Sequence, residues 1–270
     1  MIHSAVNRLF GQAKAFVAPV RKWLGAGAEE THPQEPSPAV IWAWDELKKH
    51  NRSVKQAVDA GCGRGRNSLF LAKHGVHVTA LDFTPSAINA LKLTAHAARC
   101  DDKIRALVYD VTEGWPVQQH SIDFVVDAFC FKHITGNAIR LSYKQNIIQA
   151  IDVRGALLIA FDSVGDGYYG RYITEHCGDG SALCLDPATN LQSVLFTRDH
   201  VVNFFAPEFR LLAESTGAEK PRSGGGTTRS PRALLFERNP KSQGGGYSIV
   251  KPEDALMKPR YYGEFKADDR

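Results

Sequence analysis

The chain lacks several features that would assign it to a specialised class of protein. No apolar run is long enough to cross a bilayer. The cysteines number five, an odd count, and no two of them form a C-x-x-C pair. This spacing supports neither a disulfide framework nor a zinc site, so we expect no bound metal. The 270 residues, 43% of them hydrophobic, predict one sizeable domain with tails in the cytoplasm.

The chain also has no excess of positive over negative charge outside the N-terminal segment. The formal net charge of the chain is +4. Residues 1–28 contain no acid and four basic residues, namely Arg8, Lys14, Arg21 and Lys22, so the rest of the chain is neutral overall. A neutral domain offers no general attraction for a phosphate backbone, and basic and aromatic residues are not interleaved as on RNA-binding faces. We therefore expect nucleic acid not to be a partner.

The N-terminal segment repeats apolar residues every three to four positions, which predicts an amphipathic helix interrupted or kinked at Pro19. Three interpretations remain open. The helix packs on the protein's own surface or over its active site, lies on a membrane surface through its basic side, or is an organelle transit peptide. The expected organisation is this helix with a linker over residues 1–38, a domain over 39–239 and a polar arm over 240–270.

The most informative motif is the sequence VDAGCGRGR at residues 58–66. Alternate glycines after Asp59 leave a loop with almost no side-chain bulk, so its backbone can lie against a ligand. The helix that follows directs its free N–H groups toward the same place. A dinucleotide-binding loop has the pattern G-x-G-x-x-G, but Arg66 occupies the position of the third glycine. The spacing therefore disfavours a nicotinamide oxidoreductase.

The flanking sequence alternates short β-branched or apolar runs with helical stretches. The expected strands are residues 54–58, 76–82, 104–110, 122–127, 155–161, 209–215 and 232–238, and the expected helices are residues 67–73, 84–98 and 199–205. Strands separated by helices predict a parallel sheet covered on both faces, with ligands beyond the carboxyl ends of the strands. Asp82 closes the second strand, where an acid is placed to accept ribose hydroxyls.

The D-x-G-x-G-x-G loop and the acids at the next two strand ends, Asp82 and Asp110, resemble the motifs of class I S-adenosylmethionine (SAM)-dependent methyltransferases. The resemblance covers residues 39–239 and is most specific over 54–111. It implies a Rossmann-like, doubly wound α/β fold with a mostly parallel seven-stranded sheet and an antiparallel last strand. The implied cofactor is SAM, and the implied product is S-adenosylhomocysteine. The residues expected to hold the cofactor are Asp59, Gly61, Gly63, Gly65, Asp82, Asp110, Val111 and Asp127.

A closer resemblance rests on the sequence GRNSLFLAKHGVHVTALD, which is most similar to the tellurite-resistance and thiopurine-like small-molecule branch. The chain departs from the family before the fifth strand. Many relatives have a Pro-Gly-Gly turn there, whereas this chain has the sequence IDVRG from Ile151 to Gly155.

Candidates for the acceptor side of the site follow the fourth and fifth strands. His133 suits either a general base, because its ordinary pKa is near neutrality, or a hydrogen-bonded junction residue. Asp162 suits either proton acceptance or capping of the next turn. The glycine- and tyrosine-rich loop at residues 165–172 suits either a lid whose ring faces hold a cationic centre, or packing within the loop. The expected substrate contacts are Phe131, Tyr168, Tyr169, Arg171 and Tyr172.

Methyl transfer depends mainly on orientation and the exclusion of water, so the motifs indicate the cofactor more clearly than the substrate. The leading hypothesis is transfer of a methyl group from SAM to a nitrogen, sulfur or oxygen atom of a small molecule. One alternative is methylation of a protein or RNA, with the N-terminal helix and C-terminal arm as docking elements. Another is a non-catalytic SAM-binding partner or regulatory subunit.

Overall fold

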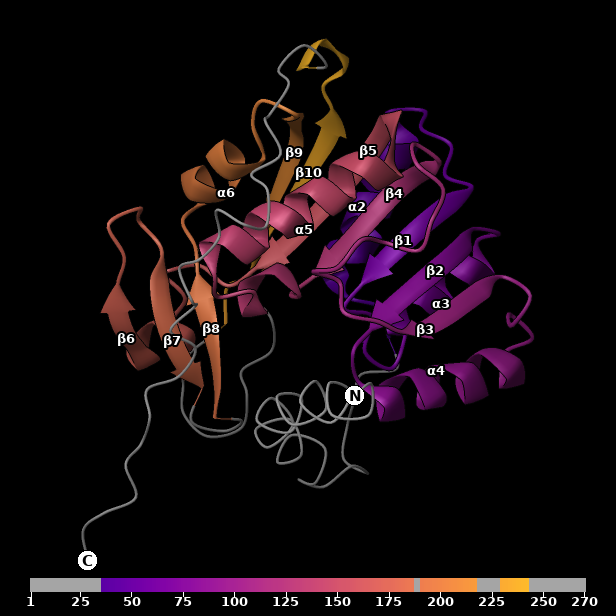
Figure 1. Cartoon of the computed structure of the whole chain (residues 1–270), viewed down its shortest axis with the longest axis horizontal. Helices are drawn as coiled ribbons and strands as arrows, with labels where there is room; N and C mark the ends of the chain where they lie inside the picture. Colours follow the sequence, from indigo (N-terminus) through magenta and orange to yellow (C-terminus); the bar gives the residue numbers. More distant parts are fainter. Residues whose placement is uncertain (1–34, 187–189, 218–228, 243–270) are drawn as a thin grey trace, which may run out of the picture.

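The computed structural model describes residues 35–186, 190–217 and 229–242, which form a large layered α/β unit and a small second sheet (Figure 1). The predicted amphipathic helix and nearly all of the C-terminal arm lie outside the described residues, so their roles stay predictions. Within the described ranges, no helix is long and apolar enough to cross a membrane. The same ranges contain no cluster of His, Cys, Asp or Glu side chains able to hold a metal ion.

The main sheet has seven strands in the order β3-β2-β1-β4-β5-β10-β9. Neighbours from β3 to β5 pair in parallel, and β10 is antiparallel to both β5 and β9. The strands are β1 Gln56–Ala60, β2 His77–Asp82, β3 Ile104–Val108, β4 Ile122–Ala128, β5 Ile151–Phe161, β9 Phe209–Thr216 and β10 Arg232–Arg238. This topology confirms the predicted Rossmann-like α/β fold with an antiparallel last strand.

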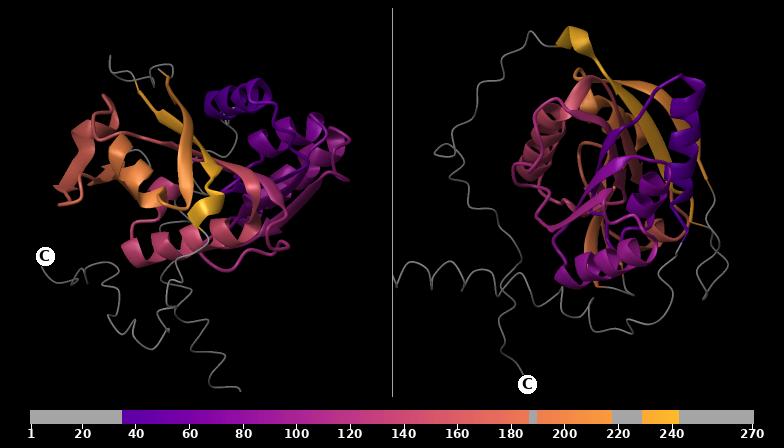
Figure 2. Two further views of the ribbon diagram at one scale, coloured as in Figure 1. Left: turned by 90° about the horizontal axis from the view of Figure 1, so that it is seen from above. Right: turned by 90° about the vertical axis from the view of Figure 1, so that its right-hand side faces the viewer.

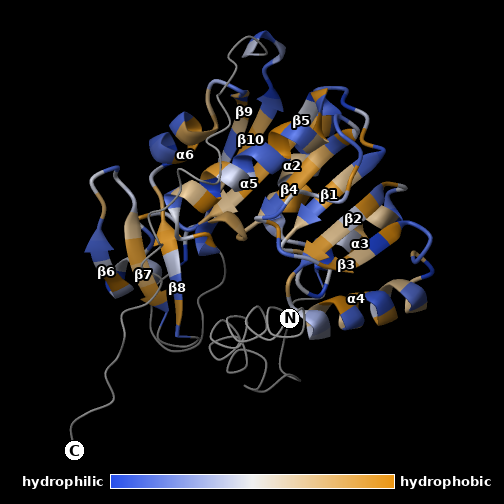
Figure 3. Cartoon of the chain, viewed as in Figure 1, coloured by the Kyte–Doolittle hydropathy of each residue, from blue (hydrophilic) through white to orange (hydrophobic). Residues whose placement is uncertain are grey.

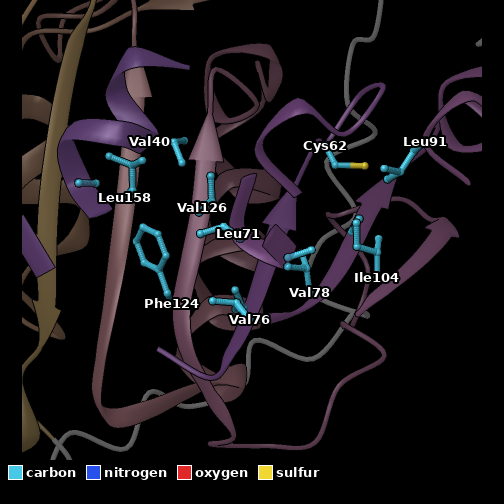
Figure 4. Packing of buried hydrophobic residues seen from close by; sticks show 14 of the residues in the cluster. Val40, Cys62, Leu71, Val76, Val78, Leu91, Ile104, Phe124, Val126 and Leu158 are labelled. Atoms are coloured by element: carbon cyan, nitrogen blue, oxygen red, sulfur yellow. The ribbon is translucent and has the colours of Figure 1, made fainter. Parts of the chain in front are cut away.

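Helices cover both faces of the main sheet, because its strands bury side chains on each side. They are α2 Pro38–Lys49, α3 Arg66–Lys73, α4 Pro85–Ala97, α5 Asn137–Ala150 and α6 Arg198–Phe205. The first three pack in one core, where Leu71 and Val126 meet (Figure 4). The last two pack in the other core, with Val125 from the same strand. Figure 2 shows α2 and α5 on opposite sides of the sheet, and Figure 3 shows apolar residues along its strands.

A second sheet, which the sequence did not predict, follows β5. It consists of β6 Ile173–His176, β7 Ala182–Asp186 and β8 Leu191–Leu195, paired antiparallel. A bridge between Ser163 and Phe196 links this segment to the end of β5. The small sheet therefore lies at the end of the main sheet where β4 and β5 terminate (Figure 1).

The fifth strand begins earlier than predicted. It starts at Ile151 rather than residue 155, and its pairing with β4 shifts between Ile122 and Phe124, which face Ile151 and Ala156. The extra residues on β5 form an irregularity that ends at Gly155. A Cβ added to Gly155 would lie 2.9 Å from the carbonyl oxygen of Ile122, so glycine is needed for this close approach.

Candidate active site

The three loop glycines all have positive φ angles, but their surroundings differ. The φ values are +68° at Gly61, +54° at Gly63 and +80° at Gly65. An added Cβ would lie 2.7 Å from Cys130 Sγ at Gly61, and 2.1 Å from Leu91 Cδ1 at Gly65. At Gly63 it would meet no described atom within 4 Å. Gly61 and Gly65 therefore let neighbouring side chains pack directly against the loop backbone, while Gly63 borders open space.

Asp82 holds the glycine loop against the end of β2. Its Oδ2 accepts a hydrogen bond from the Gly63 backbone N–H at 2.8 Å, and its Oδ1 accepts one from the Thr84 N–H at 2.8 Å. The residue is 8% exposed. Each carboxylate oxygen has two lone pairs, so both retain capacity for another donor, such as a ribose hydroxyl.

Asp59 ties the end of β1 to helix α3 rather than pointing into open space. Its Oδ2 accepts from Ser68 Oγ at 2.6 Å, and the residue is 1% exposed. Burial raises the pKa of Asp59 to about 6, the Ser68 hydrogen bond lowers it and the negative charge of Asp82 adds to the rise. Asp59 therefore fixes α3, the helix that follows the loop, to the end of β1, and its contact with the cofactor stays a prediction.

The ends of β2 and β3 bring Asp82 close to the predicted adenine residues. The Tyr109 N–H donates to the Asp82 carbonyl at 2.9 Å, so the residues after both strands share one edge. Asp110 is exposed and its Oδ1 accepts from the Thr112 backbone N–H at 2.9 Å, while Val111 is buried. Phe83, which sequence reasoning missed, is 54% exposed. An aromatic residue directly after the acid predicted to bind ribose was the signal that could have identified it.

Asp127 connects β4 to helix α5. Its Oδ1 accepts from the Cys130 N–H at 2.8 Å, and its Oδ2 accepts from the Phe131 N–H at 2.9 Å and from the Tyr143 hydroxyl at 2.7 Å. Asp127 is fully buried. Its carboxylate therefore orients the turn after β4, and a contact with the cofactor stays a prediction.

The position of Phe131 contradicts its predicted contact with the substrate. Phe131 is fully buried and stacks on Phe196, with 5.0 Å between ring centroids. A side chain without exposed surface packs the core between η1 (Phe131–His133) and β8, so it is not available to a substrate.

Asp162, proposed from the sequence as a proton acceptor, is bound by two cations. Its Oδ2 accepts from Lys132 Nζ at 2.5 Å, and Arg229 donates through Nε to Oδ1 at 2.8 Å and through a terminal nitrogen to Oδ2 at 3.1 Å. Burial favours a higher pKa for Asp162, but Lys132 and Arg229 outweigh it and lower the pKa. An ionised carboxylate held in this way is a poor base, so the catalytic role predicted for Asp162 is corrected.

His133, the other predicted base, is an exposed residue at the end of η1, but protein atoms pack around its ring. Its ring also hydrogen-bonds the backbone of Gln192 in β8. The protein atoms around the ring, together with the charge of Lys132, lower the pKa of His133 to about 4. The imidazole is therefore neutral at pH 7, the state in which it can accept a proton.

The tyrosine-rich loop after β5 is a turn held by Asp166. The Asp166 carboxylate accepts from the N–H groups of Tyr168 and Tyr169 at 2.9 and 2.8 Å, and from the Ser230 N–H at 2.6 Å. The Tyr169 ring lies under Lys132, with Nζ 4.4 Å from its centroid. Arg171 lies over the Tyr172 ring at 5.7 Å and over Tyr168 at 6.0 Å. The ring faces predicted for a cationic ligand therefore carry the protein's own cations.

The structure thus divides the predicted residues into two groups at one edge of the main sheet. The predicted cofactor residues follow β1 to β4, and the acceptor candidates follow β4 and β5 (Figure 1). Sequence reasoning missed Lys132 and Arg229 in the second group. Arg229 lies in a stretch rich in glycine, serine and threonine that indicated only a loop, so no local signal marked it.

Comparisons with known proteins agree with this arrangement. Residues 57–147 match the model of a methyltransferase domain. The 1,6-didemethyltoxoflavin N1-methyltransferase of Burkholderia thailandensis is 20% identical, with 88% of this chain and 89% of that chain covered and a TM-score of 0.58. A SAM-dependent methyltransferase of Methanosarcina mazei is 18% identical, with coverages of 76% and 98% and a TM-score of 0.58. At these identities, the two solved structures show a shared fold.

One curated relative matches over a shorter segment. Hemagglutinin 1 of Eikenella corrodens is 33% identical over 76 residues, which are 28% of this chain and 25% of that protein. The chain therefore spans about a quarter of the length of this relative.

Proposed function

Because the chain carries a methyltransferase domain in the class I SAM-dependent fold, we propose that it transfers the methyl group of SAM to a small-molecule acceptor. The cofactor is SAM, which supplies a methyl group on a sulfonium, and the product is S-adenosylhomocysteine. The observation that carries the proposal is the bond between Asp82 and the Gly63 N–H. It holds a glycine loop and an acid with acceptor capacity together at the carboxyl ends of β1 and β2.

The residues present fit SAM in chemistry as well as in position. Gly63 borders open space, so the backbone of the loop can approach the amino-acid end of the cofactor. Asp82 would accept from the ribose hydroxyls. The exposed ring of Phe83 would stack on adenine, with Asp110 and Val111 beside its amino group.

On the acceptor side, His133 is proposed to take the proton from a nucleophilic nitrogen, sulfur or oxygen atom. Its neutral imidazole lies at the end of η1, and the Gln192 backbone fixes the orientation of the ring. Asp162 serves this side by holding Lys132 and Arg229 rather than by moving a proton. The exposed Arg171 and the Tyr168 and Tyr172 rings remain proposed contacts for the acceptor.

Three observations favour a small molecule over a macromolecule. The 1,6-didemethyltoxoflavin N1-methyltransferase was solved with 1,6-didemethyltoxoflavin bound, and it aligns with most of this chain. The sheet β6–β8 packs beside η1, and the proposed acceptor residues come after the ends of β4 and β5. The sheet would therefore enclose the acceptor on one side. Beyond residue 28 the chain has no excess of positive charge to hold a nucleic acid.

The cofactor site is tested by Asp82→Ala, with Asp123→Ala as a matched control. Both carboxylates accept from two backbone N–H groups, but Asp123 does so at the start of β4, at the opposite edge of the sheet. Calorimetric titration should show SAM affinity about tenfold or more weaker in Asp82→Ala, since a charged acceptor is lost. Asp123→Ala should retain the affinity of the unaltered chain. Tight binding of NAD without binding of SAM would overturn the proposal.

The acceptor is identified by incubating the protein with methyl-labelled SAM and an extract of cell metabolites, followed by mass spectrometry. The expected result is a labelled small molecule. Label on protein or RNA would instead support a macromolecular acceptor, and SAM binding without any labelled product would support a non-catalytic binding subunit.

A further inference from the structure

Four consecutive strands of the main sheet carry an acid within two residues of their carboxyl ends (Figure 1). We call these acids the acidic strand ends; in the sheet order β3-β2-β1-β4 they are Asp110, Asp82, Asp59 and Asp127. Ala60, at the end of β1, faces Leu81 on β2 and Asp127 on β4, so the strands end at the same level. Because neighbouring strands lie about 4.8 Å apart, the four carboxylates gather at one edge of the sheet.

The hydrogen-bond partners of the acidic strand ends are neutral. Asp82 accepts from two backbone N–H groups, and Asp110 accepts from the N–H and the hydroxyl of Thr112. Asp59 accepts from a hydroxyl of α3 on one face of the sheet, and Asp127 accepts from a hydroxyl of α5 on the other. Within the described residues, none of the four carboxylates forms an ion pair.

One cation acts on this group from a distance. Arg66, in the first turn of α3, lowers the pKa of Asp59, but burial and the charge of Asp82 raise it by more. The net result is a pKa of about 6 for Asp59, above its ordinary value. The nearby arginine therefore does not cancel the negative charge around β1.

The thiol of Cys130 lies where all four charges act together. Cys130 follows β4 and touches the glycine loop, since a Cβ added to Gly61 would lie 2.7 Å from its Sγ. Burial raises the pKa of the Cys130 thiol well above its usual range, and each of the acidic strand ends raises it further. The place beside the loop therefore disfavours a negative group and favours a positive one.

The cofactor and its product differ in charge at this place. SAM has a positively charged sulfonium between its ribose and its amino-acid part, whereas S-adenosylhomocysteine has a neutral thioether there. The ribose is assigned to Asp82 and the amino-acid part to the loop at Gly63, and these two groups are bonded to each other. The sulfonium therefore falls among the acidic strand ends, and SAM gains an attraction that the product lacks.

We propose that the acidic strand ends select the positive charge of the cofactor, so that the enzyme binds SAM more tightly than S-adenosylhomocysteine. This inference rests on the proposed function, because it concerns the specificity of the same cofactor site. The acids form no separate site but surround the glycine loop that holds the cofactor. The enzyme consequently releases its product readily after transfer of the methyl group and resists inhibition by it.

Asp127 gives this preference a second signature. Burial raises the pKa of Asp127 to about 7, hydrogen bonds from Tyr143, Phe131 and Cys130 lower it, and the charge of Asp59 raises it. The thiol of Cys130 and the hydroxyl of Tyr143, which face it, have pKa values well above their usual ranges and stay neutral.

The protonation of Asp127 is therefore linked to the charge of the ligand. Below its pKa of about 7, the carboxyl group is mainly protonated in the free protein. A sulfonium nearby favours the ionised carboxylate and lowers this pKa, so binding of SAM releases a proton. A neutral thioether does not have this effect.

The test is calorimetric titration of the full chain with three ligands: SAM, S-adenosylhomocysteine and sinefungin, in which a carbon bearing a charged amine replaces the methylsulfonium. We expect SAM and sinefungin to bind about tenfold or more tightly than S-adenosylhomocysteine, because opposite charges attract more strongly at a partly buried site than in water. At about pH 6.5, titration in buffers of different ionisation enthalpy should show proton release with SAM and sinefungin but not with S-adenosylhomocysteine.

Three variants connect the preference to the acids. Asp59→Asn removes one charge but keeps an oxygen that can accept from Ser68, and Asp110→Asn does the same for Thr112 at an exposed position. Each should lower the ratio of SAM affinity to S-adenosylhomocysteine affinity, by about threefold or more for Asp59→Asn. Asp123→Asn, at the opposite edge of the sheet, is the matched control and should leave the ratio unchanged.

The affinity ratio separates charge selection from a structural role. A change that only disturbs the loop weakens both ligands alike, because they share the adenosine and amino-acid parts, and it leaves the ratio as it was. Asp110→Asn decides the outcome if Asp59→Asn does not fold, because its side chain is exposed.

The possible failures can be told apart. If neither SAM nor S-adenosylhomocysteine binds, the proposed function is wrong. The selection of charge is wrong, and the methyltransferase proposal stands, if both bind but the product binds as tightly as SAM. The same conclusion follows if proton release is equal for the two ligands, or if the folded variants at Asp59 and Asp110 keep the ratio of the unaltered protein.

Discussion

Gly63 and Gly65 have the same backbone requirement but different neighbours. Both have positive φ angles, so a Cβ costs about 1 kcal/mol at either position. At Gly65 the added atom would also lie 2.1 Å from Leu91 of helix α4, which adds about 1–3 kcal/mol of overpacking. At Gly63 it would enter the open space assigned to the cofactor.

The pair of substitutions therefore separates stability from binding. Gly65→Ala should lower the free energy of unfolding by more than about 2 kcal/mol, and Gly63→Ala by about 1 kcal/mol. Gly63→Ala should weaken SAM binding although the protein stays folded. Urea denaturation and calorimetry provide the two measurements. Equal losses of stability in the two variants would contradict the packing described at Leu91.

His133 gives a prediction of pH dependence. Its pKa of about 4 in the folded protein lies below the ordinary value of 6.5, chiefly because of burial and then because of Lys132. As the pH falls from 6.5 through 4, the unfolded chain takes up a proton at this position that the folded chain does not. His133 therefore contributes full stability above the unfolded pKa, and this contribution is lost as the pH falls through the window.

The same low pKa places the acid limb of turnover near pH 4 if His133 is the base. His133→Ala should reduce turnover by about 100-fold or more. NMR titration of the imidazole should give a midpoint near 4, and Lys132→Met should raise it. A loss of only a few-fold on substitution by alanine would assign His133 a structural role instead.

At the scale of elements, one buried carboxylate fixes how β4, η1 and α5 meet. The Tyr143 hydroxyl, from the middle of α5, donates to Asp127 at the end of β4. Tyr143→Phe removes this donor and leaves a buried carboxylate with less support, at a cost of about 1–3 kcal/mol. Tyr109→Phe is the matched control, because that exposed hydroxyl binds a loop carbonyl, and it should change stability by less than about 0.5 kcal/mol.

Chemical denaturation of both variants measures this difference. A Tyr143→Phe variant as stable as the unaltered protein would show that the Asp127 carboxylate does not depend on α5. The turn at Cys130 and Phe131 would then be held by the backbone N–H groups alone.

The elements that the sequence predicted best are those with strong local patterns. The β-branched run before Asp82 gave β2 to within one residue, and the run before the alternate glycines gave β1, which lies two residues later than the predicted residues 54–58. The strands β6–β8 escaped prediction because they are short, and β6 has little buried surface to create a pattern. Asp162 was misassigned because its partner Arg229 is 67 residues away in sequence.

At the scale of the whole molecule, the chain separates two tasks along its length. The residues assigned to the cofactor run from Asp59 to Asp127, and those assigned to the acceptor begin after β4. The first task uses a motif shared by many proteins, so the sequence predicted it with its residues. The residues proposed for the second make contacts between distant segments, so the sequence alone does not group them. The likeness to the tellurite-resistance and thiopurine-like branch, which concerns the second task, stays a prediction.

The position of β10 has a consequence for how the protein is made. Within the described residues this strand is the last in sequence, yet it lies between β5 and β9 and pairs with both. While the ribosome is still synthesising residues 232–238, β5 has an unpaired, strongly apolar edge, and β9 has no neighbour in the sheet. Such an edge invites pairing with other chains. The nascent protein is thus exposed to aggregation until β10 emerges, and chains released before residue 238 cannot complete the seven-stranded sheet.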